Sequence, residues 1–235
     1  MIASELVEVV PDFTPFGVQA FTTTRRAGSF GTSSGEAVRD VMARWESLRG
    51  FAAERGVLRF ATAAQVHGTH VVAHVPGWEG WLRGAAADGH IAPARGTALA
   101  VTIADCVPVF VAHPSGVVAL LHSGWRGTAA RIVEHAIAAL AHHGCPAAEL
   151  HIHLGPAICG RCYEVSPDVA QQLTGEPASA PRHIDLRALI AEHATARGVR
   201  QVSISPKCTR HDNEQFFSHR AGDAGRQVSV ILAES

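Results

Sequence analysis

The chain has 235 residues, and its hydrophobic content of 47% is enough to bury a sizeable core. Its 20 Lys and Arg residues balance 21 Asp and Glu residues, which excludes a global field that would attract nucleic acid or an anionic membrane. No apolar run approaches the roughly 20 residues of a membrane span, and residues 1–20 lack the basic start and apolar block of a signal peptide, so we expect a cytoplasmic globular protein.

Three short apolar runs in the middle of the chain predict strands. The runs are rich in β-branched residues and nearly continuous, a pattern typical of strands that are buried on both faces. They cover Thr97–Ile103, Val107–Ala112 and Val117–Leu121. We expect these strands to form the core of the fold.

Amphipathic segments follow in the second half of the chain. Thr128–Ala141 has its apolar residues on one helical face and is followed by Gly144, a typical helix terminator. Ser166-Pro167-Asp168 predicts the start of another helix, and Asp185–Arg197 predicts a third. Further strands are expected at Gln201–Ile204 and Gln227–Leu232. The mixture indicates an α+β or α/β fold with a mixed sheet, and the absence of repeats and long linkers predicts a single domain over residues 1–235.

Three motifs contain the residue types that bind transition metals. They are Gln65-Val66-His67-Gly68, Ala104-Asp105-Cys106-Val107-Pro108 and His122-Ser123-Gly124-Trp125-Arg126-Gly127. The thiol of Cys106 and the imidazoles of His67 and His122 suit zinc or copper and leave a coordination position open, which is typical of a catalytic site. The three residues are too far apart in the chain for a zinc finger, so only a folded domain could bring them together.

The third motif also predicts an anion site. Its glycine-containing turn leads from a strand into the helix expected after Gly127, where free N–H groups and the helix dipole favour negative charge. Arg126 in the same turn adds a planar cation suited to phosphate or carboxylate. Taken singly, a cysteine between strands is more often a buried apolar residue, and a histidine at a strand end is often a polar cap. The occurrence of all three motifs in one chain weighs against that interpretation.

The motifs closely resemble the multicopper polyphenol oxidase-like (laccase-domain) family, whose members have also been described as purine nucleoside phosphorylases and as a peptidoglycan editing factor. The resemblance covers most of the chain and includes Thr24-Arg25, Asp88-Gly89, Gly155-Pro156, Tyr163-Glu164-Val165, Cys208-Thr209 and Phe216-Phe217-Ser218-His219-Arg220. It implies an α+β fold of four layers, α/β/β/α, with mixed sheets. It also implies metal ligands at His67, Cys106 and His122, with pocket arginines at Arg25 and Arg126. The family commonly has a tyrosine at the position of His219, which is expected either in the pocket wall or on the surface.

Several activities are compatible with these residues. The favoured prediction is a metal-dependent purine nucleoside phosphorylase that uses a purine nucleoside and phosphate, with zinc preferred over copper and with Cys106, Arg126, Arg25 and Gln65 as catalytic residues. The same site suits deamination of adenosine. The alternatives are a Cys-His hydrolase that edits peptidoglycan precursors, with Cys106 as nucleophile, and a copper-dependent polyphenol oxidase. A laccase copper cluster needs several His-x-His pairs, and the pair at His151 and His153 is more typical of a polar strand face.

The other cysteines give weaker evidence for a disulfide, redox or metal function. The chain has five cysteines, an odd number that does not resemble a disulfide framework, so we expect them to be reduced. Cys159-x-x-Cys162 is compatible with a redox or zinc pair, but no second such pair exists and Cys208 stands alone in the sequence. The favoured interpretation is a loop that tolerates a cysteine. The oligomeric state is not predicted.

Overall fold

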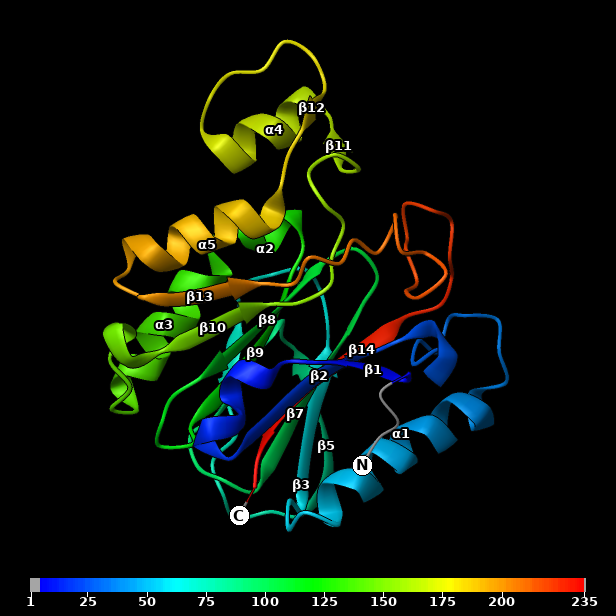
Figure 1. Ribbon diagram of the computed structural model, residues 1–235, viewed down its shortest axis with the longest axis vertical. Helices are drawn as coiled ribbons and strands as arrows, with labels where there is room; N and C mark the ends of the chain where they lie inside the picture. Colours follow the sequence, from blue (N-terminus) through cyan, green and yellow to red (C-terminus); the bar gives the residue numbers. More distant parts are fainter. Residues whose placement is uncertain (1–4, 235) are drawn as a thin grey trace.

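Two six-stranded mixed sheets pack face to face in the computed structural model, which describes residues 5–234 (Figure 1). The strand order of the first sheet is β1 (Val7–Val9), β2 (Val18–Thr23), β14 (Gln227–Ala233), β7 (Thr97–Ile103), β3 (Arg59–Ala64) and β5 (Gly80–Ala86). The order of the second is β13 (Gln201–Ile204), β10 (His151–Leu154), β8 (Val107–Ala112), β9 (Val118–Ser123), β6 (Gly89–Ala92) and β4 (Val71–Ala73). Parallel pairs join β3 to β5 and β7 in the first sheet, and β10 to β13 and β4 to β6 in the second.

Helices cover the outer face of each sheet (Figure 1). The first sheet is covered by α1 (Val38–Ala53), and the second by α3 (Ile132–His142) and α5 (Leu186–Ala196). The short helix α2 (Trp125–Ala129) follows β9 directly. Helix α4 (Pro167–Thr174) projects from the body together with a two-stranded antiparallel sheet, formed by β11 (Glu164–Val165) before it and β12 (Arg182–His183) after it. Three 3-10 turns lie at Pro11–Phe16, Arg25–Ala27 and Ala147–Glu149.

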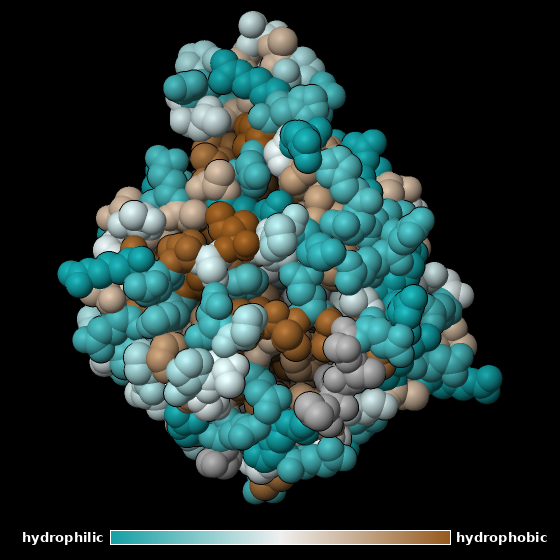
Figure 2. Space-filling model, in the orientation of Figure 1, coloured by the Kyte–Doolittle hydropathy of each residue, from teal (hydrophilic) through white to brown (hydrophobic). Residues whose placement is uncertain are grey.

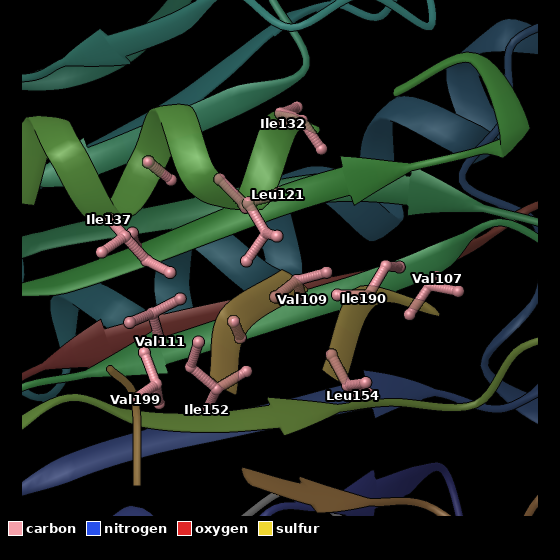
Figure 3. Packing of buried hydrophobic residues seen from close by; sticks show 14 of the residues in the cluster. Val107, Val109, Val111, Leu121, Ile132, Ile137, Ile152, Leu154, Ile190 and Val199 are labelled. Carbon is pink, nitrogen blue, oxygen red and sulfur yellow. The ribbon is translucent and has the colours of Figure 1, made fainter. Parts of the chain in front are cut away.

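Separate apolar clusters hold the layers together. Leu99, Phe110 and Leu120 belong to the cluster between the two sheets, and Trp45 of α1 packs against the outer face of the first sheet. The cluster between the second sheet and its helices is shown in Figure 3, where the side chains of α3 and α5 meet those of β8, β9 and β10. The α/β/β/α layering that the family resemblance implied is therefore confirmed.

The structure confirms the bounds of three predicted strands, at Thr97–Ile103, Val107–Ala112 and Gln201–Ile204. The predicted helix over Thr128–Ala141 is instead two helices, α2 and α3, separated at Arg131. Arg131 has a left-handed φ of 61°, and such a residue interrupts the series of i to i−4 hydrogen bonds. The apolar stripe was correctly assigned, because Ile132, Val133 and the other stripe residues of α3 are buried on the sheet.

Helix α2 also begins earlier than the predicted helix. It starts at Trp125 and has five residues, so Gly127 lies inside α2 rather than before it. The anion site that we expected at a helix start after Gly127 is therefore wrong in its placement, and only Arg126 remains of that prediction.

The surface of the face in Figure 2 is mainly hydrophilic, with small hydrophobic groups between the polar side chains. Large exposed hydrophobic residues in the described part of the chain include Val9, Leu58 and Val75. Within residues 5–234, no helix combines the length and the apolar character that crossing a membrane requires.

Candidate metal centre and active site

The structure brings His67, Cys106 and His122 together from three different elements. His67 lies in the segment between β3 and β4, Cys106 lies in the turn by which the chain passes from β7 of one sheet to β8 of the other, and His122 lies near the end of β9. One ligand atom of each residue lies within 4.8 Å of the other two. The imidazole rings of His67 and His122 are nearly perpendicular, with centroids 4.7 Å apart. This spacing is compatible with three ligands around one metal ion.

The backbone around the centre is adapted to this convergence. His67 and Asp105 have left-handed φ angles of 60° and 81°, which sharpen the two turns that present His67 and Cys106. Gly124 lies directly against both ligands, and a Cβ atom there would be 2.9 Å from Sγ of Cys106 and 3.1 Å from Cδ2 of His67. Any side chain at this position would displace the ligands, so the glycine belongs to the site.

A buried carboxylate, Asp88, holds two of the three ligands in place. Its oxygens accept hydrogen bonds from the backbone N–H groups of Val66, His67 and Gly68 at 3.1, 3.0 and 2.7 Å. Its Oδ1 also accepts a hydrogen bond from Nδ1 of His122 at 2.8 Å. Because Nδ1 is occupied in this way, Nε2 of His122 is left for a metal, as in the carboxylate–histidine pairs of metal sites. Sequence analysis noted Asp88-Gly89 but assigned it no role, and no local signal linked it to His122.

Ionisation at the centre makes Cys106 the charged form that binds metal ions, whereas His122 would have to lose a proton in order to bind one. Burial would raise the pKa of the Cys106 thiol, but the charge of His122 and hydrogen bonds from His122 and His67 outweigh it and lower this pKa to about 6. Burial would likewise lower the pKa of His122, whereas the Cys106 thiolate and the hydrogen bond to Asp88 raise it to about 9. At neutral pH Cys106 is therefore a thiolate, the form that binds metal ions.

The donor set, its supporting carboxylate and the space beside Gly124 fit a resident metal ion. One thiolate and two imidazoles are ligands that zinc and copper accept, and three protein ligands leave a position for a substrate or water. Two groups of His, Cys, Asp and Glu residues in the described part of the chain have the spacing that a metal ion needs, and this is one of them.

A cavity of about 330 Å³ opens onto this centre. Its volume lies within the roughly 300–1,000 Å³ of small-ligand pockets. His67 and Cys106 line it together with Ala104, Asp105, Trp125, Arg126, Ile158, Tyr163, Leu186, His219 and Arg220. Burial and the neighbouring Cys106 raise the pKa of Tyr163 to about 12, so its hydroxyl group stays protonated and can donate a hydrogen bond. His67 and Cys106 thus face a pocket with aromatic and cationic walls.

Two arginines contribute positive charge to this pocket. The guanidinium of Arg126 lies 4.4 Å from the centre of the Trp125 ring, and no hydrogen bond or ion pair within residues 5–234 involves it. The guanidinium of Arg220 lies 5.1 Å from the ring of Tyr163 and donates a hydrogen bond of 3.0 Å to the carbonyl of Glu164. Arg126 therefore lies in the pocket with an available guanidinium, and its role in binding an anion stays a prediction, while Arg220 was not identified as a pocket residue from sequence.

The structure gives Arg25 and Gln65 other partners. Arg25 forms an ion pair of 2.6 Å with Asp223 and donates to the carbonyl of Asn213, and it is not among the residues that line the pocket. The side chain of Gln65 is hydrogen-bonded to Thr102 by both its amide nitrogen and its oxygen. Gln65 lines a second cavity of about 650 Å³, which lies over the first sheet and shares His219 with the pocket. His219 is thus a pocket residue, which resolves the alternative left open by the sequence.

Asp105 is another site residue that sequence analysis did not identify. Its Oδ1 accepts a hydrogen bond of 2.6 Å from the hydroxyl of Thr209, and its Oδ2 accepts one of 2.7 Å from the backbone N–H of Arg220. These bonds tie the left-handed turn before Cys106 to the segment between β13 and β14. The sequence signal that could have identified Asp105 is its position beside Cys106, because Asp adopts a left-handed φ more readily than most residues.

Comparison with known proteins identifies the family of the chain. The profile of the multi-copper polyphenol oxidoreductase laccase family matches residues 20–234, so the chain belongs to this family. A purine nucleoside phosphorylase of Deinococcus radiodurans is 35% identical over 201 residues, which are 80% of this chain and 74% of that protein. Adenosine deaminase RL5, from an unknown prokaryotic organism, is 33% identical over 147 residues, which are 57% of this chain and 56% of that protein.

The fold is also found in a solved structure. The Bacillus licheniformis protein YfiH superimposes with a TM-score of 0.87 at 22% identity, and the superposition covers 100% of this chain and 98% of YfiH. The family resemblance drawn from the sequence motifs is thereby confirmed, together with the architecture that it implied.

Proposed function

We propose that this protein is a metal-dependent purine nucleoside phosphorylase that takes a purine nucleoside and phosphate as substrates. The observation that carries the proposal is that His67 and Cys106 of the ligand trio line the same cavity as Arg126, whose guanidinium has no hydrogen-bond or ion-pair partner within residues 5–234. Relatives named purine nucleoside phosphorylase at 35% and 36% identity support it. The cavity is also of a size that suits a nucleoside.

Zinc is the metal that we propose for the centre, with copper as the alternative. A zinc ion held by His67, Cys106 and His122 would supply Lewis-acid chemistry at the floor of the pocket. Two imidazoles and one thiolate with an open position are a donor set known for catalytic zinc. We also propose a cytoplasmic location, because all five cysteines are free thiols and free thiols persist in a reducing compartment.

The residues of the pocket account for the other requirements of phosphorolysis. In this reaction a phosphate oxygen bonds to C1′ of the ribose, the bond from C1′ to N9 of the purine breaks, and the departing base takes up a proton. Arg126 binds the phosphate by charge-assisted hydrogen bonds and holds it beside the nucleoside. The ring of Trp125 offers a surface for stacking the purine, and the protonated hydroxyl of Tyr163 donates a hydrogen bond.

The test is an incubation of the purified protein with adenosine and with inosine, each with and without phosphate. Release of free base that depends on phosphate, with formation of the sugar phosphate, is the expected result. Metal analysis of the same preparation identifies the ion. Absence of base release with either nucleoside in the metal-loaded protein would overturn the proposal.

Deamination of adenosine is a second activity that we propose for the same pocket. The relative named adenosine deaminase favours it, and the chemistry needs water to replace the amino group at C6 of adenine, with ammonia as the leaving group. Conversion of adenosine to inosine without phosphate is the readout. Because this product is distinct from free adenine, one chromatogram separates the two activities.

The other activities predicted from the sequence receive less support. Cys106, His122 and Asp88 resemble a cysteine-hydrolase triad, but such a triad needs one base, whereas here His67 also lies against the sulfur. His151 packs on the ring of Phe16 and His153 is hydrogen-bonded to Ser203, and neither belongs to a metal-type group within residues 5–234. The multicopper centre of a polyphenol oxidase thus has no counterpart in the described residues.

A further inference from the structure

A second group of metal-type ligands lies outside the pocket. It consists of Cys159, Cys162, Cys208 and His211, and one ligand atom of each lies within 4.8 Å of the other three. The first two residues lie in the segment between β10 and β11, and the last two lie in the segment that follows β13 (Figure 1). The sequence interpretation of a loop with a tolerated cysteine treated Cys208 as isolated, but the fold places it beside the pair.

The contacts within this group are close. Nδ1 of His211 is 3.7 Å from Sγ of Cys159, and Nε2 of the same ring is 3.2 Å from Sγ of Cys162. Sγ of Cys208 accepts a hydrogen bond of 3.3 Å from the backbone N–H of Cys159. In a tetrahedral site with zinc–sulfur bonds of about 2.3 Å and a zinc–nitrogen bond of about 2.0 Å, neighbouring ligand atoms are roughly 3.5–3.8 Å apart. Small side-chain movements therefore suffice to enclose an ion.

We propose that Cys159, Cys162, Cys208 and His211 bind a structural zinc ion. Four protein ligands close the coordination sphere, and three cysteines with one histidine are a common structural zinc set. The ligands come as two close pairs, each separated by two residues, which is the spacing of such sites. Cys162 and Cys208 are buried, with 8% and 4% exposure, so an ion there would be shielded from water on one side.

The position of the second ligand group indicates which part of the fold a bound ion would stabilise. Ile158 and Tyr163 flank the first ligand pair, and both line the pocket of Cys106. Thr209 lies within the second pair and donates the hydrogen bond that holds Asp105. The two segments meet at a β-bridge between Ala157 and Cys208. An ion bound to all four ligands would therefore clamp together the two segments that form one wall of the active site.

Metal content tests this site independently of the proposed activity. After expression with added zinc, the purified protein is expected to hold about two zinc ions per chain. Cys159→Ser and His211→Ala should each hold about one, and Cys106→Ser should also hold about one because it loses the other ion. Cys145→Ser is the matched control, since Cys145 is a buried free thiol outside both groups, and it should keep both ions.

Cobalt substitution identifies which ion is lost. The sulfur-to-cobalt absorption of the Cys106→Ser protein should remain strong, because it arises from three thiolates, whereas Cys159→Ser should lose most of this absorption. His211→Cys should keep the second ion, since four thiolates also bind zinc, and this variant separates ligation from folding. His211 is exposed, so His211→Ala is expected to fold even if a cysteine variant does not.

Three results would overturn the proposal. One is a wild-type protein with a single zinc ion that Cys106→Ser removes. Another is a Cys159→Ser or His211→Ala protein that keeps both ions. The third is a disulfide between Cys159 and Cys162 in the freshly purified protein, detected by alkylation and peptide mapping. None of these results would affect the proposed phosphorylase activity, which is measured with nucleosides at the first centre.

Discussion

The two groups of metal-type ligands differ in number, in surroundings and in the way that the chain assembles them. The first has three ligands from three separate segments, rests on the buried Asp88 and faces a cavity of about 330 Å³. The second has four ligands from two segments and packs against Ile158 in a small apolar cluster. Three ligands leave a position for a reacting molecule, and four leave none. The two proposals follow from this difference, since they assign chemistry to the group with an open position and the architecture of the pocket wall to the group with four ligands.

The support behind each group differs as well. His67 and His122 share one carboxylate, so their positions are coupled through Asp88. In the second group Cys208 donates its backbone N–H to Asp212 at 2.9 Å, but within residues 5–234 no single residue is hydrogen-bonded to all four ligands. A metal ion would itself be the common partner there. Changes around the first centre are therefore expected to affect activity most, and changes in the second to affect the pocket wall.

Gly124→Ala is expected to have the largest effect at the open centre. Gly124 has a φ of −81° that alanine can adopt, so the new Cβ acts only by its contact with Cys106 and His67. Displacement of ligands from their working geometry typically costs about 100-fold in activity. We expect such a loss of kcat/KM together with weaker zinc retention. Gly50→Ala is the control, because a Cβ at Gly50 meets nothing within 4 Å, and equal activity of both variants would contradict the prediction.

Asp88→Asn tests the support of the centre rather than its ligands. Asparagine cannot hold His122 with a carboxylate charge, although it keeps the size of the side chain. Loss of such a supporting group typically costs about 10- to 100-fold in metal affinity or activity. Competition with a chelator gives the affinity, and steady-state kinetics give the activity. The control variant is Asp168→Asn, because Asp168 is an exposed carboxylate at the start of α4. A wild-type metal affinity in Asp88→Asn would refute the coupling of His67 and His122 through Asp88.

Arg126→Ala should separate phosphate binding from metal binding. The guanidinium is unpaired within residues 5–234 and Arg126 belongs to neither ligand group, so its removal should leave the metal content unchanged. Loss of one charge-assisted hydrogen bond is worth about 1.5 kcal/mol or more, which is roughly a tenfold rise in the KM for phosphate. Arg39→Ala on α1 removes an exposed arginine of similar size and serves as control. An unchanged KM for phosphate would remove Arg126 from the proposed mechanism.

The sequence was sufficient to predict the central strands and the convergence of His67, Cys106 and His122, for physical reasons that are visible in these residues. Thr97–Ile103 and Val107–Ala112 are apolar on both faces, which is a pattern that a strand between two layers must have. His67, Cys106 and His122 stand in distinctive motifs, and their chemistry indicates a metal without any knowledge of distance.

The residues that sequence analysis missed depend on contacts between distant segments. Asp88 and Asp105 act through hydrogen bonds to His122 and Thr209, and no local pattern encodes such bonds. Cys208 stands alone in the sequence and meets Cys159 only because the segment after β13 runs beside the segment after β10. The break at Arg131 was missed because the apolar stripe continues through it, and a stripe does not report a single left-handed residue.

The comparison extends to a buried pair of histidines, His74 and His90, whose side chains meet at 2.9 Å through Nε2 and Nδ1. Burial and the nearby His74, only partly offset by Asp88, lower the pKa of His90 from its usual value near 6.5 to about 3. His122 has the opposite shift, because it lies beside Cys106 and Asp88. His90 is therefore a neutral histidine of the core, whereas His122 is built to face a negative charge.

The sign of this shift predicts how stability changes with pH. Because the folded protein holds His90 neutral and the unfolded chain binds a proton below pH 6.5, the stability from His90 is complete above pH 6.5 and is lost as the pH falls toward 3. Between pH 7.5 and 5.5 this loss is about 1.4 kcal/mol. His90→Asn, which keeps a polar atom near the position of Nδ1, should therefore lose about 1.4 kcal/mol less than wild type over this range in urea unfolding. Equal losses in the two proteins would mean that folding does not lower the pKa of His90.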